Sequence, residues 1–115
     1  MSVIIVPSQS VPSPVRMTIG TNASYTSTVV IPINNVVSSI FVNILSAYSA
    51  GATIAVTCNG QTLMSTTNNN PQVIELYEFL TDVVISAASI ITVTINGSPS
   101  AGSGTVIVNY SFPSR

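Results

Sequence analysis

Apolar and polar residues alternate through most of this chain, and the alternating segments are rich in valine, isoleucine, threonine and serine. Because successive side chains of a strand point to opposite faces, a period of two predicts β-structure. The clearest example is residues 91–95, where isoleucine and valine share one face and threonines occupy the other. Residues 105–112 repeat the pattern, with Val106, Val108 and Tyr110 on one face. We therefore expect these two segments to pair as neighbouring strands.

Eight strands are expected in all, separated by short polar segments. They cover approximately residues 15–20, 24–33, 38–47, 53–58, 61–66, 72–79, 89–96 and 104–112. Asn59-Gly60 is the strongest hairpin signal between them, because both residues readily adopt the left-handed backbone of a type I′ turn. This spacing of strands and turns predicts an all-β fold, an antiparallel β-sandwich that is either jelly-roll or immunoglobulin-like.

One stretch in the second half of the chain fits two structures. Its acids Glu75, Glu78 and Asp82 have helical spacing, whereas the neighbouring segments favour a strand. The pattern therefore fits either a strand or a one- or two-turn helix between the sheets. The three carboxylates match no calcium-loop signature and have no tuned proton donor beside them. We interpret them as a solvated stripe, or as a contact for Arg16 or Arg115 of a neighbouring copy.

Two single residues carry specific structural predictions. Pro32 lies inside a strand pattern and cannot donate a hydrogen bond to a neighbouring strand, so its strand is expected at a sheet edge or at a bulge. Cys58 is the one cysteine of the chain, which excludes an intrachain disulfide. Because cysteine usually packs as a small hydrophobe, a buried free thiol is favoured over a bridge to another molecule.

Two parts are expected along the chain: an N-terminal strand and linker arm at residues 1–14, and a β-sandwich domain at residues 15–115. The arm begins with a short apolar run, and the proline- and serine-rich segment after it is typical of an extended linker. The run either pairs within its own domain or adds to an exposed sheet edge of a neighbouring copy. The N-terminus does not have the pattern of a signal peptide, and no segment is apolar for long enough to span a membrane.

Ionisable groups are scarce in this sequence. It has 2 basic residues, both arginine, 3 acidic residues and no histidine, while 46% of its 115 residues are hydrophobic. An ordinary domain is about 25% charged. Serine and threonine supply 31 of the 115 residues. The surface is therefore expected to consist of hydroxyl and amide groups that hardly respond to pH or salt, and that provide little repulsion between copies.

This composition removes the residues that most chemistry requires. Without histidine or lysine, the serine–histidine and cysteine–histidine nucleophiles and Schiff-base chemistry are unavailable. One cysteine and no histidine make a zinc or iron–sulfur site untenable. No glycine-rich phosphate loop precedes a helix, and a net charge of −1 gives no basic patch for nucleic acid. We therefore expect no enzyme, no cofactor, no metal and no nucleic-acid partner.

Candidate interaction residues come from the aromatic side chains, the apolar arm and the two arginines. Tryptophan is absent and the tyrosines are dispersed, which favours packing in a core or interface over stacking on a sugar ring. Tyr48 lies in a loop and is the best candidate for an exposed contact, including one with a surface glycan or receptor. The full set of candidates is Val3, Ile4, Ile5, Val6, Tyr48, Arg16 and Arg115.

The whole-chain pattern resembles small single-jelly-roll virion proteins, particularly those of viruses that infect acid-loving archaea. The resemblance rests on the missing signal peptide, the lysine-free composition and the strand series through Tyr110-Ser111-Phe112. It implies a capsid, turret or decoration subunit in a virion or extracellular surface structure. Its partners would be copies of itself and other structural proteins of the assembly.

Two other functions fit the same residues. One is a carbohydrate- or receptor-binding β-sandwich module that uses loops such as 48–51 and 96–104. The other is a filament or pilus subunit joined by strand donation from residues 3–6.

Overall fold

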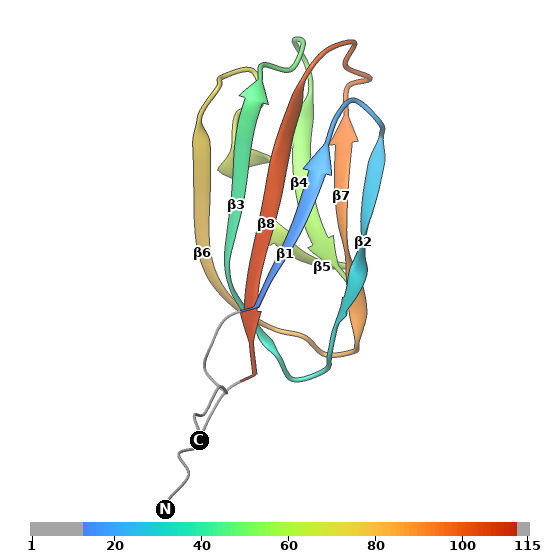
Figure 1. Cartoon of the computed structure of the whole chain (residues 1–115), viewed down its shortest axis with the longest axis vertical. Coiled ribbons are helices and arrows are strands. Elements are labelled where there is room, and N and C mark those ends of the chain that lie inside the picture. Colours follow the sequence, from blue (N-terminus) through green and yellow to red (C-terminus); the bar gives the residue numbers. More distant parts are fainter. Residues whose placement is uncertain (1–12, 113–115) are drawn as a thin grey trace, which may run out of the picture.

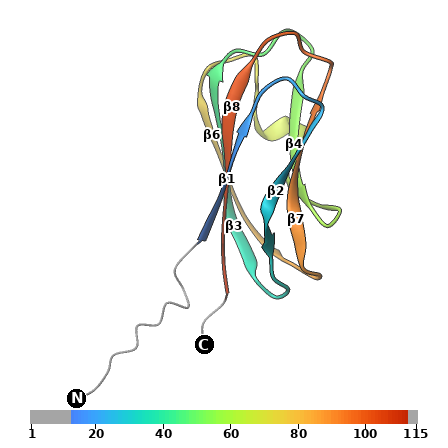
Figure 2. The same cartoon turned by 45° about the vertical axis from the view of Figure 1, so that its right-hand side comes forward.

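Two four-stranded antiparallel sheets pack face to face in the computed structural model, which describes residues 13–112 (Figures 1 and 2). The strands are β1 (Ser13–Ile19), β2 (Ser24–Ile31), β3 (Val36–Ser46), β4 (Thr53–Cys58), β5 (Gln61–Met64), β6 (Leu76–Val84), β7 (Ser89–Asn96) and β8 (Ser103–Ser111). One sheet has the order β1-β8-β3-β6 and the other has the order β2-β7-β4-β5. The all-β antiparallel sandwich expected from the sequence is confirmed. The expected pairing of residues 91–95 with residues 105–112 is wrong, because β7 and β8 lie in different sheets and the connection between them crosses from one sheet to the other.

The strand order is that of one long hairpin folded over on itself. β1 pairs with β8, β2 with β7, β3 with β6 and β4 with β5, so the chain pairs from its two ends inward. The hairpin closes at Asn59 and Gly60, whose φ angles of 52° and 77° are those of the expected type I′ turn. Eight strands in two such sheets form a jelly roll, which decides between the two sandwich types.

The core lies between the sheets and is built from the alternating apolar positions. In β4, for example, every second residue is buried, and the same holds for the central part of β8. Ile54, Val56, Val93, Val106 and Val108 are all fully buried. Each such side chain contributes roughly 1.5–3 kcal/mol through its removal from water. Because neither outer face is needed to form this core, the outer residues are free to serve another purpose.

Residue-level expectations about the core are mostly met. Cys58 is a free thiol with no exposed surface, and Tyr110 is partly buried against the core. Burial raises the pKa of the Cys58 thiol, with a weak hydrogen bond to the Ser89 carbonyl acting in the opposite direction. β2 is an edge strand with an irregular register, as expected for the strand that precedes Pro32. It ends at Ile31, two residues before the expected end, so Pro32 follows the strand and does not lie inside it.

The ambiguous acidic stretch is a strand, and the helical alternative is wrong. β6 begins at Leu76, later than the expected residue 72, because a turn with a hydrogen bond from Val73 N to Asn70 O precedes it. Exposed and half-buried residues alternate along the whole of β6, which is the period of a strand and not of a helix. The one short helix in this part of the chain is a 3₁₀ turn at Thr66–Asn68, which the sequence pattern did not predict.

The division into an arm and a domain stays a prediction, because residues 1–12 lie outside the described residues. β1 begins at Ser13, inside the linker that was expected to extend to residue 14. Among residues 13–112, no helix has the length and apolar character needed to cross a membrane.

Candidate assembly surface

The charged side chains of residues 13–112 lie on one sheet or immediately beside it. Arg16 lies in the middle of β1, Glu78 and Asp82 lie on β6, and Glu75 immediately precedes β6. All four side chains are exposed. β1 and β6 are the two edge strands of their sheet, so the sheet has one positive and one negative edge.

Strand register places Arg16 and Glu78 in one row across the outer face of this sheet. Arg16 of β1 is opposite Ile107 of β8, Ile107 is opposite Phe41 of β3, and Phe41 is opposite Glu78 of β6. Residues directly opposite each other in antiparallel strands share a face. The row therefore runs from a cation, over two large apolar side chains, to an anion. Its two ends are about 14 Å apart, since three strand spacings of about 4.8 Å separate them.

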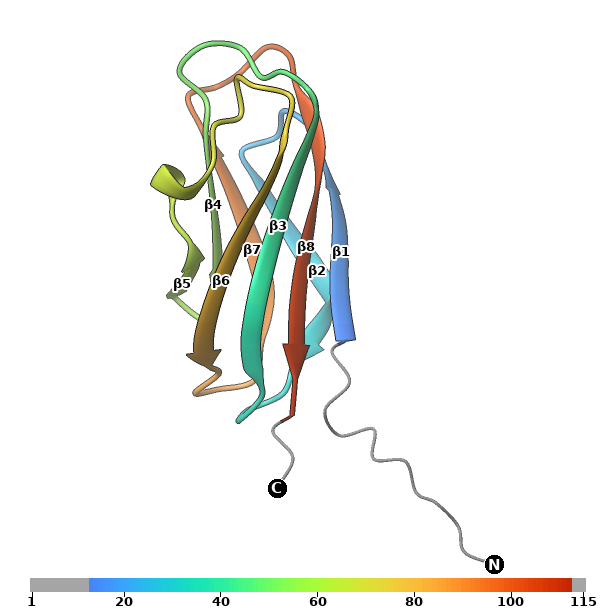
Figure 3. The ribbon, with the colours of Figure 1, turned by 90° about the vertical axis from the view of Figure 1, so that its left-hand side faces the viewer.

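Apolar side chains surround this row. Leu76, Leu80 and Val84 point outward from β6 and are exposed by 56%, 70% and 54%. The face toward the viewer in Figure 3 is this outer surface, with β6, β3, β8 and β1 side by side. A shallow hollow of about 370 Å³ lies in its centre. The hollow is lined by Arg16, Phe41, Asn43, Leu76, Thr105, Ile107 and Asn109. Besides its exposed apolar side chains, the face contains one ordered hydrogen bond of 3.0 Å, which Asn109 Nδ2 donates to Ser39 Oγ.

The outer face of the other sheet has a different chemistry. Its central row consists of four threonines, Thr26, Thr92, Thr57 and Thr62, one from each of β2, β7, β4 and β5. No charged residue lies on these four strands. Hydroxyl groups can hydrogen-bond to water in any orientation, so this face is well suited to solvent.

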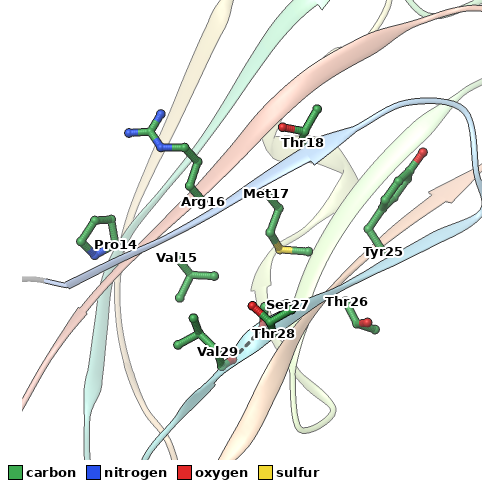
Figure 4. A pocket seen from close by; sticks show the side chains of 10 residues that line it. All are labelled: Pro14, Val15, Arg16, Met17, Thr18, Tyr25, Thr26, Ser27, Thr28 and Val29. Atoms are coloured by element: carbon green, nitrogen blue, oxygen red, sulfur yellow. Dashed lines mark hydrogen bonds between the residues drawn. The ribbon is translucent and has the colours of Figure 1, made fainter.

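A second hollow lies where the two sheets open, between the edge strands β1 and β2 (Figure 4). It has a volume of about 230 Å³. Val15 and Met17 point into it, whereas Arg16 points away. The Ser27 hydroxyl accepts a hydrogen bond from Ile91 N at 3.0 Å and donates one to Val29 O at 2.7 Å. It thereby replaces backbone pairing at the point where the β2–β7 register shifts.

The interaction predicted for Tyr48 is wrong. Its side chain is only 3% exposed, and its hydroxyl donates a hydrogen bond to Gly20 O at 2.8 Å. The ring lies against Gly102, where a Cβ would come within 2.3 Å of the ring. Burial, with a smaller effect of nearby Tyr25, raises the pKa of Tyr48 to about 12. The rest of the 48–51 loop is exposed or half-buried, and the Tyr48 side chain turns inward to the acceptor at Gly20 and the space at Gly102.

Of the other predicted interaction residues, only Arg16 lies within the part of the chain that the structure describes. Arg16 is exposed at the centre of a sheet edge, where it is available to a partner. Val3, Ile4, Ile5, Val6 and Arg115 lie outside the described residues, so their role remains a prediction. Phe41 and Ile107 were not among the interaction residues predicted from the sequence. Their outward positions follow from strand alternation, but their contact across β3 and β8 requires the register.

The other titratable side chains of residues 13–112 have structural roles. No cluster of three or more histidine, cysteine, aspartate or glutamate residues in this range could hold a metal ion. The Cys58 thiol is buried, and its raised pKa disfavours the reactive thiolate. The pKa of Tyr77 is also raised, through desolvation and the nearby Glu75 carboxylate. Its hydroxyl donates to Asn70 O at 2.8 Å, which anchors the turn before β6.

Comparison with known proteins finds relatives in structure alone. No family model and no curated protein matches the sequence. A chain in the acidic stable capsid structure of Helicobacter pylori bacteriophage KHP30 has a TM-score of 0.65 and 15% identity, covering 92% of this chain and 91% of that one. A chain in the capsid asymmetric unit of cyanophage Pam1 has a TM-score of 0.66 and 12% identity, covering 97% and 94%. This chain therefore shares its fold with chains of phage capsids over nearly the whole length of both.

Proposed function

We propose that this protein is a structural subunit of a virus particle, present in many copies in its capsid or on the surface of that capsid. The observation that carries the proposal is the jelly-roll fold shared with chains from two capsid structures. Both matches cover more than nine-tenths of each chain, so the likeness extends over the whole sandwich.

The surface supports the same role. Neighbouring subunits must remove surface from water, and an unpaired charge buried in such a contact costs several kcal/mol. This protein has only five formal charges. Of the four on described residues, three lie on a single sheet and Glu75 immediately precedes that sheet's strand β6. Contacts made by other surfaces of residues 13–112 would bury hydroxyl, amide and apolar groups. The polar groups among them can hydrogen-bond to the neighbouring subunit, so their burial costs little free energy. Low charge also leaves the surface nearly unchanged between acidic and neutral pH.

The proposal includes no catalytic step and no particular host. The two structural neighbours belong to a bacteriophage and a cyanophage, whereas the compositional resemblance in the sequence is to archaeal virus proteins. The proposed role is geometric and depends on neither origin. The alternative of a glycan-binding module loses its main support, because Tyr48 is buried and hydrogen-bonded within the fold.

Particles purified from a culture that carries the gene provide the test. Mass spectrometry should find this chain in a fixed, multi-copy ratio to the other particle proteins, and cryo-electron microscopy should show density that fits two four-stranded sheets. A protein that stays entirely in the particle-free fraction would contradict the proposal.

The N-terminal run can be tested in the same particles. Residues 3–6 either pair within their own domain or add to a neighbouring copy. If they add to a neighbouring copy, deletion of residues 1–8 should reduce incorporation. The matched control replaces residues 1–8 by a serine- and glycine-rich segment of equal length, which keeps the chain length but removes the strand. A deletion variant that is incorporated normally would rule out this role of the arm.

A further inference from the structure

We propose that the outer face of the β1-β8-β3-β6 sheet binds the same face of a second copy, with a two-fold axis that runs along the strands. The partner proposed for this surface is a second copy of the chain. This inference rests on the proposed function only because that function requires many copies. It concerns the purified chain, so its test does not depend on whether particles contain the protein.

Symmetry makes this face complementary to itself. When two sheets stack face to face, a two-fold axis parallel to the strands exchanges their edges, so that β1 lies over β6 and β8 lies over β3 of the other copy. Arg16 of each copy then faces Glu78 of the other, and Ile107 faces Phe41. One row of four residues thus forms two ion pairs and two apolar contacts. A two-fold axis across the strands would instead place Arg16 over Arg16, which is repulsive.

The spacing of stacked sheets allows these contacts. Packed sheets lie about 10 Å apart and are rotated by about 30°. Such a rotation displaces the ends of the row by about 4 Å while leaving its centre in place. The apolar pair, Phe41 and Ile107, is near the axis, where alignment is best. Arg16 and Glu78 are at the ends, where long side chains can bridge the displacement.

The apolar content of the face favours this arrangement over a contact between sheet edges. Placing β1 of one copy beside β6 of the next would also bring Arg16 toward Glu78. It would leave Phe41 and Ile107 in water, together with the hollow between them. Face-to-face packing covers both residues and also Leu80, whose side chain is 70% exposed in the single chain. An isologous contact of this kind closes at two copies, whereas an edge contact repeats from copy to copy.

The size of the face predicts a weak pair. Four strands about 4.8 Å apart and about seven residues long give a face of about 19 by 23 Å. The pair then covers about 900 Å² in total, below the roughly 1,200–2,000 Å² of stable specific complexes. We expect an association that populates in concentrated solution and becomes persistent in an assembly, where linked contacts reinforce each other.

Cross-linking with a short bismaleimide tests the pair at low occupancy. The double variant Arg16→Cys/Glu78→Cys places two thiols about 14 Å apart within one chain. In the proposed pair each thiol faces a thiol of the other copy across sheets about 10 Å apart, too far for a direct disulfide but within reach of a short linker. The reagent should therefore give a covalent dimer and nothing larger. Thr26→Cys/Thr62→Cys is the matched control, because these residues occupy the two ends of the corresponding row on the other sheet. The control should remain monomeric under the same conditions.

Each outcome of this experiment is informative. A dimer that forms at least tenfold faster than in the threonine control, and that is lost when Phe41→Asp is added, supports the face-to-face pair. A ladder of trimers and larger species means edge contacts and overturns it. Equal rates in the two variants also overturn it, and would leave this face to a different protein. Circular dichroism of the reduced variants checks that each one is folded.

Discussion

The outer faces of the two sheets differ more from each other than their shared core would suggest. Both faces consist of the residues that alternate with buried core positions. One face carries Arg16, Glu78 and Asp82, whereas no charged residue lies on the strands of the other. The central row of one face is Arg16, Ile107, Phe41 and Glu78, and that of the other is Thr26, Thr92, Thr57 and Thr62.

The difference shows how a protein with few charges can distinguish two surfaces. Threonine hydroxyls keep their hydrogen bonds to water and gain little from a partner. Exposed leucine and phenylalanine gain about 25 cal/mol for each Å² removed from water. Opposite charges at the two ends of the row then select one orientation, since electrostatic complementarity governs specificity more than affinity. In the proposed pair, Glu78 is a contact for Arg16 of the other copy, which is the second of the two interpretations that the sequence allowed for the acids.

The largest effect on this contrast is expected from a charge placed at the centre of the apolar face. Phe41→Asp would put an unpaired carboxylate opposite Ile107 of the second copy, which costs several kcal/mol when buried. We expect association to weaken by more than a hundredfold in analytical ultracentrifugation. Thr92→Asp is the control on the other face and should leave association unchanged. Similar losses in both variants would show that the two faces are equivalent.

Alkaline pH should destabilise the fold without distinguishing the faces. Tyr48 has its pKa raised from 10.0 to about 12 at the end shared by both sheets. Below pH 10 the phenol is protonated in both folded and unfolded chains, so its contribution is fully present. Between pH 10 and 12 the unfolded chain releases the proton while the folded chain retains it, so the free energy of unfolding falls by on the order of 2 kcal/mol.

The variant Tyr48→Phe isolates this contribution. It lacks the hydroxyl that donates to Gly20 O, so it should start about 1 kcal/mol less stable at pH 8. Urea unfolding at several pH values should then show a smaller decline in stability above pH 10 than in the parent chain. Cys58 adds a decline of the same sign in both proteins and cancels in the comparison. Parallel curves for the two proteins would rule out the assignment to Tyr48.

Charge reversal should have an intermediate effect on pairing. Arg16→Glu or Glu78→Arg alone places like charges opposite each other in the proposed pair, and we expect each to weaken association by about tenfold. An equimolar mixture of the two variants restores both ion pairs, so it should associate as strongly as the parent protein. Sedimentation velocity of each variant and of the mixture provides the measurement. A mixture no stronger than its components would disprove the Arg16–Glu78 contact.

The smallest effect is expected from salt. Exposed ion pairs contribute about 0–1 kcal/mol and are screened, because the Debye length falls from about 10 Å at 0.1 M to about 3 Å at 1 M salt. The pair should therefore weaken only two- to threefold over this range, while apolar contacts maintain it. A Phe41→Ala variant should become more sensitive to salt than the parent. A pair lost completely at 1 M salt would show that the ion pairs, and not the apolar row, hold it together.

Local patterns predicted much of the fold because their causes are local. Alternation located eight strands, and the conformational preferences of Asn59 and Gly60 located the central turn. The stretch that contains β6 remained ambiguous. Three acids at helical spacing fit a short helix, but they also fit an edge strand whose outward residues include both polar and apolar types. Only pairing with β3 decides between them.

Tyr48 shows a second limit of prediction from sequence. A tyrosine beside serine, alanine and glycine has the surroundings of an exposed loop residue. Its burial depends on Gly20 and Gly102, which are distant in the chain and provide the acceptor and the space. The absence of a side chain at Gly102 is visible in the sequence, but the ring that occupies the space is not.

The sequence by itself determined the strands, the buried alternation and the shortage of ionisable groups, because each of these depends on residue type and on spacing within a few residues. Tertiary structure decided which outward residues share a row. Arg16, Ile107, Phe41 and Glu78 are separated by dozens of positions in the chain and meet only through the register of four strands. Register is set by the combined packing of both sheets, since a shift of one residue would turn every core side chain outward.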